Sequence, residues 1–399
     1  MRDLVTELAV AGTTKIVLVV LDGLGGLRTA DRASELTEAT LPNLDRLAAE
    51  GSSGVHAVVG PGITPGSGAG HLAIFGYDPL VHELGRGALS AAGIGFPLQP
   101  GDVAARVNFC TLDDTGLVAD RRAGRIPTEE NARLCKLVLE GVRLPPGFEL
   151  FLETERDHRA LLVLSGPHLF PAVADTDPQL VGLPPRDPVG LTPEAAPTAA
   201  LIANVLGQIR AILAGETANF VLLRGFDGLR AFPSFGDRYK LRAFGVAGYP
   251  MYLGIARILG MTVAPAQPGF AESVECLRRA WAGHDLFYIH HKGPDSAGED
   301  GDFDRKCRAI EEVDALLPRI LELGPDVVCV TGDHATPAQL RTHSWHPVAF
   351  TMWGPAVGVD EVDRFDEAAA RRGAFGEKHA KDLMPLMLAA AGRLARYGP

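Results

Sequence analysis

Runs of apolar residues alternate with amphipathic stretches along most of this chain. Residues 15–21 are a lysine followed by six apolar residues, which predicts a buried parallel strand. Residues 42–51 carry proline at their start and glycine at their end, which predicts a short helix. Further strands are expected over 285–290, 327–331 and 348–353, and further helices from residue 71 and over 245–259, 304–323 and 381–391. Strands that alternate with helices predict an α/β fold with a doubly wound, mostly parallel sheet.

The pattern changes in the middle of the chain. Alternating or apolar stretches at 103–111, 161–164 and 219–223 predict strands, helices are expected over 128–139 and 199–214, and prolines are frequent from 178 to 197. We therefore expect a smaller α+β domain, residues 95–234, inserted into a discontinuous core domain formed by residues 1–94 and 235–399. A length of 399 residues agrees with two domains.

Asp333 and His334 directly follow an apolar run and Gly332. Both residue types bind divalent metals. Adjacent side chains of a strand point to opposite faces, so both can reach one ion only after the chain has turned, and we expect Gly332 to permit that turn. An isolated Asp-His pair usually lies in a surface turn. Three other segments end in a similar way, which favours a shared site.

Two of these segments lie near the start of the chain. Asp22 follows the predicted strand over 15–21, at the edge where open α/β sheets bind ligands; the alternative is a helix N-cap. Ser67 lies among four glycines and a proline in residues 62–71. It is either a turn residue or an accessible nucleophile of the kind that covalent phosphotransferases use. His71 either lines the pocket or caps a helix.

The last segment is a loop crowded with carboxylates. Asp295 and Glu299 are four residues apart, so one helical turn would place them on one face. His343 and His346 add two imidazoles after the Asp-His pair. An acidic loop alone is normally just solvated, but oxygen and nitrogen ligands from four strand ends predict a site for two divalent ions, Mn, Zn or Mg. The ligands fall before residue 96 and after residue 284, so the fold must unite them across the insertion.

Charge and composition narrow the classes of partner. A net charge of −11 and a pI of about 5.6 argue against nonspecific binding of nucleic acid, whereas local arginines can still bind small anions. Five scattered cysteines indicate reduced thiols in a cytoplasmic protein. The first residues lack a signal-peptide apolar core, and no apolar run approaches the ~20 residues that span a bilayer. We expect no nucleic-acid or membrane partner; the sequence is compatible with an oligomer.

A set of ordered motifs resembles the archaeal-type, cofactor-independent phosphoglycerate mutases of the alkaline phosphatase superfamily. Each motif is weak alone, but together they run in family order over nearly the whole chain. The matching segments are Val20-Leu-Asp22-Gly, Thr64-Pro-Gly-Ser67-Gly-Ala-Gly-His71 through Asp78-Pro, Gly85-Arg-Gly-Ala-Leu, Asp120-Arg-Arg-Ala-Gly-Arg125, Leu223-Arg224-Gly, Lys292-Gly-Pro-Asp295-Ser-Ala-Gly, Thr331-Gly-Asp333-His334-Ala-Thr-Pro and His343-Ser-Trp-His346-Pro-Val.

The resemblance implies Ser67 as the nucleophile that becomes phosphoserine. It implies one metal held by Asp22, Ser67, Asp333 and His334, and a second held by Asp295, Glu299 and His343. The family usually has histidine at the position of Glu299. A carboxylate there is harder and adds negative charge, so we expect a shift toward Mn or Mg, a weaker second site or an altered reaction, with His346 as a potential substitute ligand.

The resemblance also implies the reaction. It is the interconversion of 2- and 3-phosphoglycerate in glycolysis and gluconeogenesis, catalysed by an isomerase that needs two divalent metal ions and no 2,3-bisphosphoglycerate. The inserted domain would clamp this small phosphorylated substrate. The expected residues are Asp120 and Arg121 in catalysis, Arg122, Arg125, Arg224 and His71 in substrate binding, and Arg159 and Arg238 as weaker candidates. The alternatives are a metal-dependent phosphatase or other phosphomutase on this scaffold, or a non-catalytic binding protein.

Overall fold

The computed structural model describes residues 3–398 and divides the chain into two compact units. The first unit runs to Glu83 and resumes at Phe232, and the second is Leu84–Ala231. The division that the sequence suggested lies at 94/95 and 234/235. The helix Arg86–Ile94 therefore belongs to the second unit, where it lies against the strands of that unit.

The first unit is built on an eight-stranded sheet in the order β13-β2-β12-β11-β1-β10-β8-β9. Its strands are β1 Ile16–Leu21, β2 Ser52–Ala57, β8 Ala243–Val246, β9 Thr262–Val263, β10 Leu286–His291, β11 Val327–Thr331, β12 Val348–Trp353 and β13 Gly376–His379. Only β12 runs against the others, since its pairings with β11 and β2 are antiparallel and the remaining pairings are parallel. The predicted α/β fold with a mostly parallel sheet is confirmed.

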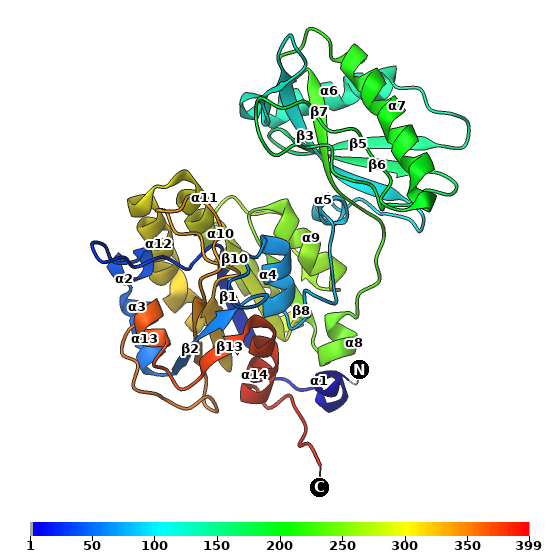
Figure 1. Cartoon of the computed structure of the whole chain (residues 1–399). Coiled ribbons are helices and arrows are strands. Elements are labelled where there is room, and N and C mark those ends of the chain that lie inside the picture. Colours follow the sequence, from blue (N-terminus) through cyan, green and yellow to red (C-terminus); the bar gives the residue numbers. More distant parts are fainter. Residues whose placement is uncertain (1–2, 399) are drawn as a thin grey trace. The chain divides into compact units, whose positions relative to one another are not determined.

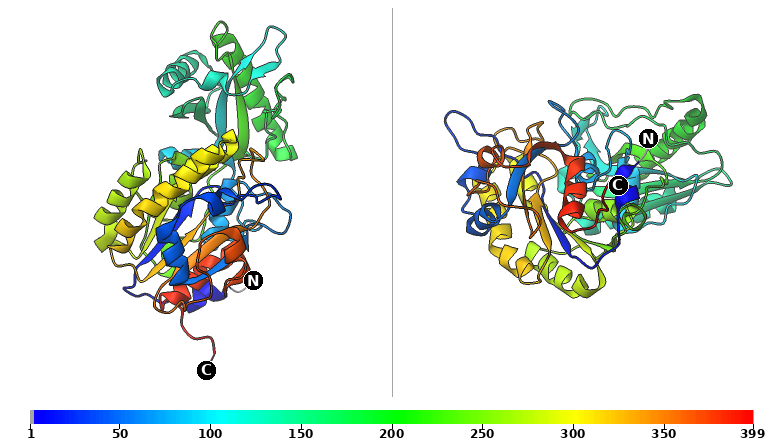
Figure 2. Two further views of the ribbon diagram at one scale, coloured as in Figure 1. Left: turned by 90° about the vertical axis from the view of Figure 1, so that its left-hand side faces the viewer. Right: turned by 90° about the horizontal axis from the view of Figure 1, so that it is seen from below.

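Helices cover both faces of this sheet. The helices of this unit are α1 Leu4–Leu8, α2 Glu35–Glu38, α3 Pro42–Ala49, α4 Ser67–Ile74, α8 Phe235–Tyr239, α9 Pro250–Ile258, α10 Phe270–Ala280, α11 Gly293–Asp300, α12 Phe303–Leu321, α13 Glu367–Ala370 and α14 Leu383–Ala390. Helices α10 and α12 lie on one face, and α4 and α14 lie on the other (Figures 1 and 2). The central strand β1 is buried along its whole length, as its run of six apolar residues requires.

The second unit is a five-stranded antiparallel sheet with helices. Its elements are α5 Arg86–Ile94, β3 Val103–Leu112, β4 Val118–Asp120, α6 Thr128–Gly141, β5 Glu149–Arg156, β6 Arg159–Ser165, α7 Ala196–Ile212 and β7 Phe220–Asp227. Strand β3 is central and pairs with β6 and β7, and at its end with β4. The predicted smaller α+β part of the fold is therefore present.

One helical segment of this unit bears on the expectation that no apolar run of the chain approaches the length that spans a bilayer. Pro193–Ile212 is 20 residues long and, within residues 3–398, is the one helix apolar enough to pass for a membrane span by length and composition. Its residues Ile202, Val205 and Ile209 are buried in the core of the second unit. A core helix of this kind passes the same test, so the segment is weak support for a membrane span.

Candidate active site

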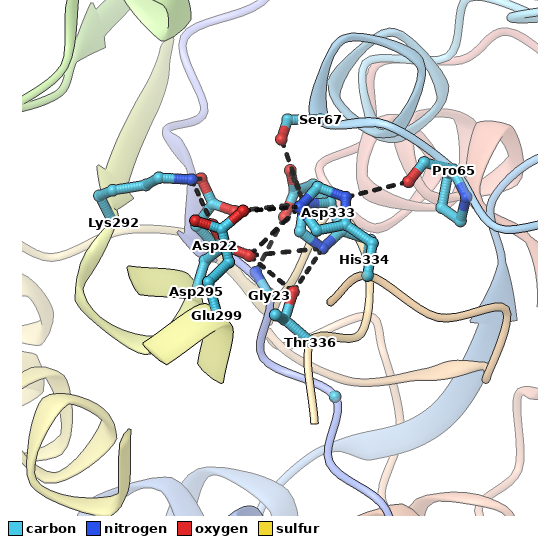
Figure 3. A network of polar contacts seen from close by, with 12 residues as sticks. Asp22, Gly23, Pro65, Ser67, Lys292, Asp295, Glu299, Asp333, His334 and Thr336 are labelled. Carbon is cyan, nitrogen blue, oxygen red and sulfur yellow. Dashed lines mark hydrogen bonds and ion pairs between the residues drawn. The ribbon is translucent and has the colours of Figure 1, made fainter. Parts of the chain in front are cut away.

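The predicted ligands meet where three neighbouring strands end. Asp22 follows β1, and Asp333 and His334 follow β11. Asp295 lies in the first turn of α11, which begins two residues after β10. Because β11, β1 and β10 are adjacent and parallel, their carboxyl ends share one edge of the sheet. Residues far apart in sequence therefore point toward one another (Figure 3).

Gly332 acts differently from the sequence-based expectation. Its φ is not in the left-handed region, so the turn does not depend on glycine conformation. Instead, a Cβ at Gly332 would lie 2.7 Å from the backbone oxygen of Leu21. The glycine is needed because β11 approaches the end of β1 too closely for a side chain.

Ser67 is the first residue of α4 and points toward the strand ends (Figure 3). Its Oγ lies 3.1 Å from Nε2 of His334. The helix lies very close to the loop after β11. A Cβ at Gly70 would lie only 2.4 Å from the backbone oxygen of Asp333, so a side chain does not fit there. Glycine at position 70 thus sets how near Ser67 comes to the ligands.

Asp22, Asp333 and His334 form the first group of potential metal ligands, and all three are fully buried. Nε2 of His334 lies 3.3 Å from Oδ1 of Asp22 and 3.3 Å from Oδ2 of Asp333. Both carboxylate oxygens are buried and lack a hydrogen-bond partner. Buried oxygens of this kind are costly unless a cation or donor satisfies them. The donor set and its unmet oxygens therefore fit a divalent cation.

Asp295, His334 and His343 form the second group. Nε2 of His343 lies 3.5 Å from Oδ1 of Asp295, and its ring stacks on that of His334 with centroids 3.7 Å apart. Glu299 lies next to this group but is not part of it. Its side chain is 51% exposed, and its Oε1 lies 4.0 Å from Nε2 of His343. His346 instead contacts Ser344 and stacks on Trp345, and it belongs to neither ligand group in residues 3–398.

Sequence reasoning missed Lys292 and two residues near it, His290 and Tyr252. Nζ of Lys292 donates to Asp295 Oδ2 at 2.5 Å, to Asp22 Oδ2 at 3.2 Å and to the hydroxyl of Tyr252 at 2.9 Å. Nε2 of His290 lies 3.0 Å from Oδ2 of Asp22. The signal available in the sequence was the lysine that directly follows the strand ending in two histidines.

Burial and neighbouring charges set the protonation states of Asp22 and His334. Burial acts to raise the pKa of Asp22, but Lys292, followed by the hydrogen bond with His290, holds that pKa well below its usual value. Burial lowers the pKa of His334, although Asp333 and Asp22 oppose the shift. The carboxylate is thus ionised and the imidazole is neutral near pH 7, which are the forms that bind metal.

His71 lies beneath this site rather than at its surface. It is fully buried in α4, its Nδ1 lies 2.9 Å from the carbonyl oxygen of Ser67 and 3.2 Å from Oδ2 of Asp333. The sequence left two roles open for His71, lining the pocket and capping a helix. These contacts are different from both. They describe a histidine that hydrogen-bonds the first turn of α4 and lies beside Asp333.

Relatives of known family resemble this chain over its whole length. A family model for 2,3-bisphosphoglycerate-independent phosphoglycerate mutase matches residues 48–219. A protein of Thermus thermophilus, named a probable 2,3-bisphosphoglycerate-independent phosphoglycerate mutase, is 47% identical over 398 residues, which cover 98% of each chain. This chain belongs to the 2,3-bisphosphoglycerate-independent phosphoglycerate mutase family.

Solved structures share the fold of this chain, and one of them is a named phosphoglycerate mutase. The PH0037 protein from Pyrococcus horikoshii is 26% identical and has a TM-score of 0.82, over 97% of this chain and 100% of its own. The cofactor-independent phosphoglycerate mutase from Thermoplasma acidophilum is 30% identical and has a TM-score of 0.68, over 95% of this chain and 100% of its own. The predicted family, and the prediction of an isomerase independent of 2,3-bisphosphoglycerate, are confirmed.

In this phosphoglycerate mutase, the candidate substrate residues of the second unit have partners of their own. Arg121 forms a two-bond ion pair with the buried Asp177, at 3.0 and 2.6 Å. Asp120 accepts hydrogen bonds from the backbone N–H groups of Arg122 and Gly124, which shape the turn after β4. Nε of Arg224 lies 3.5 Å from Oδ2 of Asp177. The structure therefore unites Arg121 and Arg224 around one carboxylate.

Arg122 and Arg125 are exposed, and their charges act with others on His158. Burial, followed by the charges of Arg159, Arg122, Arg106 and Arg125, lowers the pKa of His158 to about 3. Sequence reasoning missed Arg106, a β3 residue whose buried Nε lacks a hydrogen-bond partner. Four guanidinium groups thus create a positive field within the second unit. Arg238, the other weak candidate, lies in the first unit over the ring of Tyr77 and pairs with Asp3.

Proposed function

We propose that this phosphoglycerate mutase interconverts 2- and 3-phosphoglycerate through a phosphoserine at Ser67, beside two divalent cations. The observation that supports the proposal most is the position of Ser67 Oγ, 3.1 Å from the one imidazole nitrogen that two buried carboxylates also face. Asp22, Asp333 and His334 would hold one cation with Ser67. Asp295 and His343, with Glu299 beside them, would hold the other.

Bound divalent cations would activate the serine oxygen and stabilise charge on the transferring phosphoryl group. The chain's own groups contribute to the same end. Ser67 begins a helix, and a helix N-terminus favours a negative charge such as a phosphate attached to that residue. Lys292 keeps its ammonium at the edge of the ligand group, where it balances Asp22 and Asp295.

The second unit would bind the anionic ends of the substrate. Guanidinium groups hold carboxylates and phosphates through paired hydrogen bonds. Arg122 and Arg125 are exposed and offer such groups, and Arg106 and Arg159 add to their field. Arg121 and Arg224 share Asp177, so we propose that they position the neighbouring residues and meet the substrate with their remaining N–H groups. Asp120 would carry the protons of the departing and returning hydroxyl groups.

A mutase must keep the dephosphorylated glycerate and exclude water, since attack by water on the phosphoserine would make it a phosphatase. The exposed Glu299 favours metal-dependent phosphatase activity as the second candidate function, because a loosely held second site would retain the intermediate less well. A non-catalytic binding role has less support, since Ser67 and the fully buried ligands are all present. We also propose a cytoplasmic location, with phosphoglycerate as the small-molecule partner.

The test is an assay that follows both products. Protein stripped with EDTA and reloaded with Mn²⁺, Zn²⁺ or Mg²⁺ is given 3-phosphoglycerate, and 2-phosphoglycerate is measured with enolase alongside free phosphate. We expect isomerisation with little phosphate release; phosphate without 2-phosphoglycerate would establish the phosphatase, and neither product with any metal would refute both.

The Ser67→Ala variant should lose roughly 10³-fold or more of the activity and stay folded. The matched control is Ser273→Ala, which removes a serine hydroxyl from α10 that donates to the carbonyl of Gly269. Mass spectrometry of the wild type after rapid quenching should find phosphate on the peptide that contains Ser67. Full activity of Ser67→Ala would exclude the phosphoserine route.

A further inference from the structure

Thr336 lies between the two groups of metal ligands and is fully buried. Its Oγ1 lies 2.6 Å from Oδ1 of Asp295 and 3.0 Å from Nδ1 of His334 (Figure 3). A threonine hydroxyl has one proton to donate and lone pairs to accept with. Asp295 belongs to one ligand group and His334 to both, so this hydroxyl joins the two groups.

The direction of each hydrogen bond follows from the chemistry of the partners. An ionised carboxylate only accepts, so the hydroxyl of Thr336 donates its proton to Asp295. The same oxygen must then accept from His334, which requires the proton of the neutral imidazole to be on Nδ1. Nε2 of His334 therefore carries a lone pair. The same Nε2 atom faces Ser67 Oγ. It also faces Oδ1 of Asp22 and Oδ2 of Asp333, the two carboxylate oxygens that lack a hydrogen-bond partner.

The backbone of Thr336 is fixed independently of its side chain. Its N–H points to the carbonyl oxygens of Gly25, at 3.1 Å, and Gly23, at 3.3 Å. Its carbonyl oxygen accepts from Nζ of the fully buried Lys306 at 2.8 Å. A Cβ at Gly298 would lie 2.2 Å from that oxygen, so α11 also closes against it. The hydroxyl therefore has little freedom to reach other partners.

We propose that Thr336 is a positioning residue that selects the Nδ1–H tautomer of His334 and at the same time orients Asp295, so that the two cation sites form together. The inference rests on the proposed two-cation site. Groups that hydrogen-bond to metal ligands fix the tautomer and orientation of those ligands, and their loss typically costs about 10- to 100-fold in metal affinity. Here one hydroxyl acts on ligands of both cations, so its removal should weaken both.

The tautomer can be measured directly in the wild type. Protein labelled with ¹⁵N-histidine, free of metal and at pH 8, is studied by long-range ¹H–¹⁵N correlation, and the His334 signals are assigned by their loss in His334→Gln. We expect the proton on Nδ1 and an unprotonated Nε2. A proton on Nε2 of His334 would overturn the proposal, whatever the variants do.

The variants test the coupling between the sites. Thr336→Val keeps the shape of the side chain and removes the hydroxyl, and Thr336→Ser keeps the hydroxyl. The control is Thr198→Val, which removes a buried hydroxyl that accepts from the backbone N–H of Phe170 in the second unit. Circular dichroism checks that each variant is folded, and Mn²⁺ binding is measured by calorimetry without substrate.

We expect Thr336→Val to weaken both Mn²⁺ sites by about 10- to 100-fold, with Thr336→Ser within a few-fold of wild type and Thr198→Val unchanged. Wild-type affinity at both sites in folded Thr336→Val would overturn the proposal, as would a loss at only one of them. If Thr336→Val does not fold, the wild-type tautomer decides alone. Neither measurement uses phosphoglycerate, so failure of the proposed reaction would be recognised separately.

Discussion

Replacing Lys292 by methionine would remove the one lysine or arginine that, within residues 3–398, contacts any of the three buried carboxylates of the candidate site. Its Nζ lies 2.5 Å from Oδ2 of Asp295 and 3.2 Å from Oδ2 of Asp22. Burial acts to lower the pKa of Lys292, but Asp22, with Tyr252 and Asp295, raises it well above its usual value. Methionine keeps much of the length of the apolar stem, so the variant mainly deletes the charge.

The expected loss of stability follows from this geometry. Removing one partner of a buried ion pair costs about 3–5 kcal/mol. The side chain of Lys292 is 30% exposed, whereas those of Asp22 and Asp295 are 0% exposed, so we expect the lower end of that range, about 3 kcal/mol. A change of 1 kcal/mol shifts the melting temperature of a unit of this size by roughly 2–4 °C, so the metal-free variant should melt about 6–12 °C below wild type.

Divalent cations should reverse part of this loss. A ligand that binds only the folded state adds stability in proportion to the logarithm of its concentration over its dissociation constant. In Lys292→Met the oxygens of Asp22 and Asp295 are no longer held by an ammonium, so Mn²⁺ should raise the melting temperature more than it does in wild type. Scanning calorimetry in EDTA and in millimolar Mn²⁺ measures both effects. The control is Lys136→Met, where the side chain is 78% exposed.

Two results would refute this reasoning. In the first, metal-free Lys292→Met would melt within about 2 °C of wild type, like a surface substitution. In the second, Mn²⁺ would raise the melting temperature of both proteins equally, which would mean that Lys292 and the cations do not share the carboxylates. A large loss in Lys136→Met would show instead that the method does not separate buried from exposed charges.

Three further predictions concern single positions. Glu299→His should preserve or raise mutase activity with Zn²⁺ or Mn²⁺ in the enolase-coupled assay, and loss of activity with every metal would show that the carboxylate has another role. Gly70→Ala should cost about 1–3 kcal/mol in urea denaturation and weaken Mn²⁺ binding, because its Cβ would lie 2.4 Å from the backbone oxygen of Asp333; unchanged binding would contradict this. The pKa of His158 is about 3 when folded and 6.5 when unfolded, so the unfolded state binds the extra proton between these values and wild-type stability falls as the pH drops through this range. Between pH 7 and pH 5 the free energy of unfolding, measured by urea denaturation, should therefore fall by about 2 kcal/mol less in His158→Leu than in wild type. An equal fall in both proteins would disprove the lowered pKa of His158.

The clustering of the candidate metal ligands could be predicted because their signal is local. Asp22, Asp333 and His334 directly follow apolar runs, and parallel strands bring such positions to one edge of a sheet. The supporting residues have no such signal. Thr336 and Tyr252 look like ordinary loop and helix residues, and their roles arise from contacts over 41 and 40 positions of sequence, with Asp295 and Lys292 respectively.

Strand β2 was missed for a related reason. Its residues Ser52–Ala57 include two serines, a glycine and a histidine, which give no apolar run, yet all six are buried. Two of the polar side chains have partners in neighbouring elements: Nε2 of His56 lies 2.8 Å from Oγ1 of Thr331, and Oγ of Ser53 donates to Oγ1 of Thr351 at 3.1 Å. Strand β8 was hidden in the same way, because the helical interpretation of 245–259 absorbed the end of a four-residue strand.

The balance of charge at the strand ends connects these observations. Three fully buried carboxylates and one ammonium leave two negative charges, which burial in a protein makes costly. A doubly charged phosphate on Ser67 would add two more, and two divalent cations would neutralise all four. Glu299 adds a further charge, but its side chain is 51% exposed, so water screens it. This explains how a carboxylate can stand beside His343 at little cost in stability, and we therefore expect Glu299 to affect the preference for metals and not the fold.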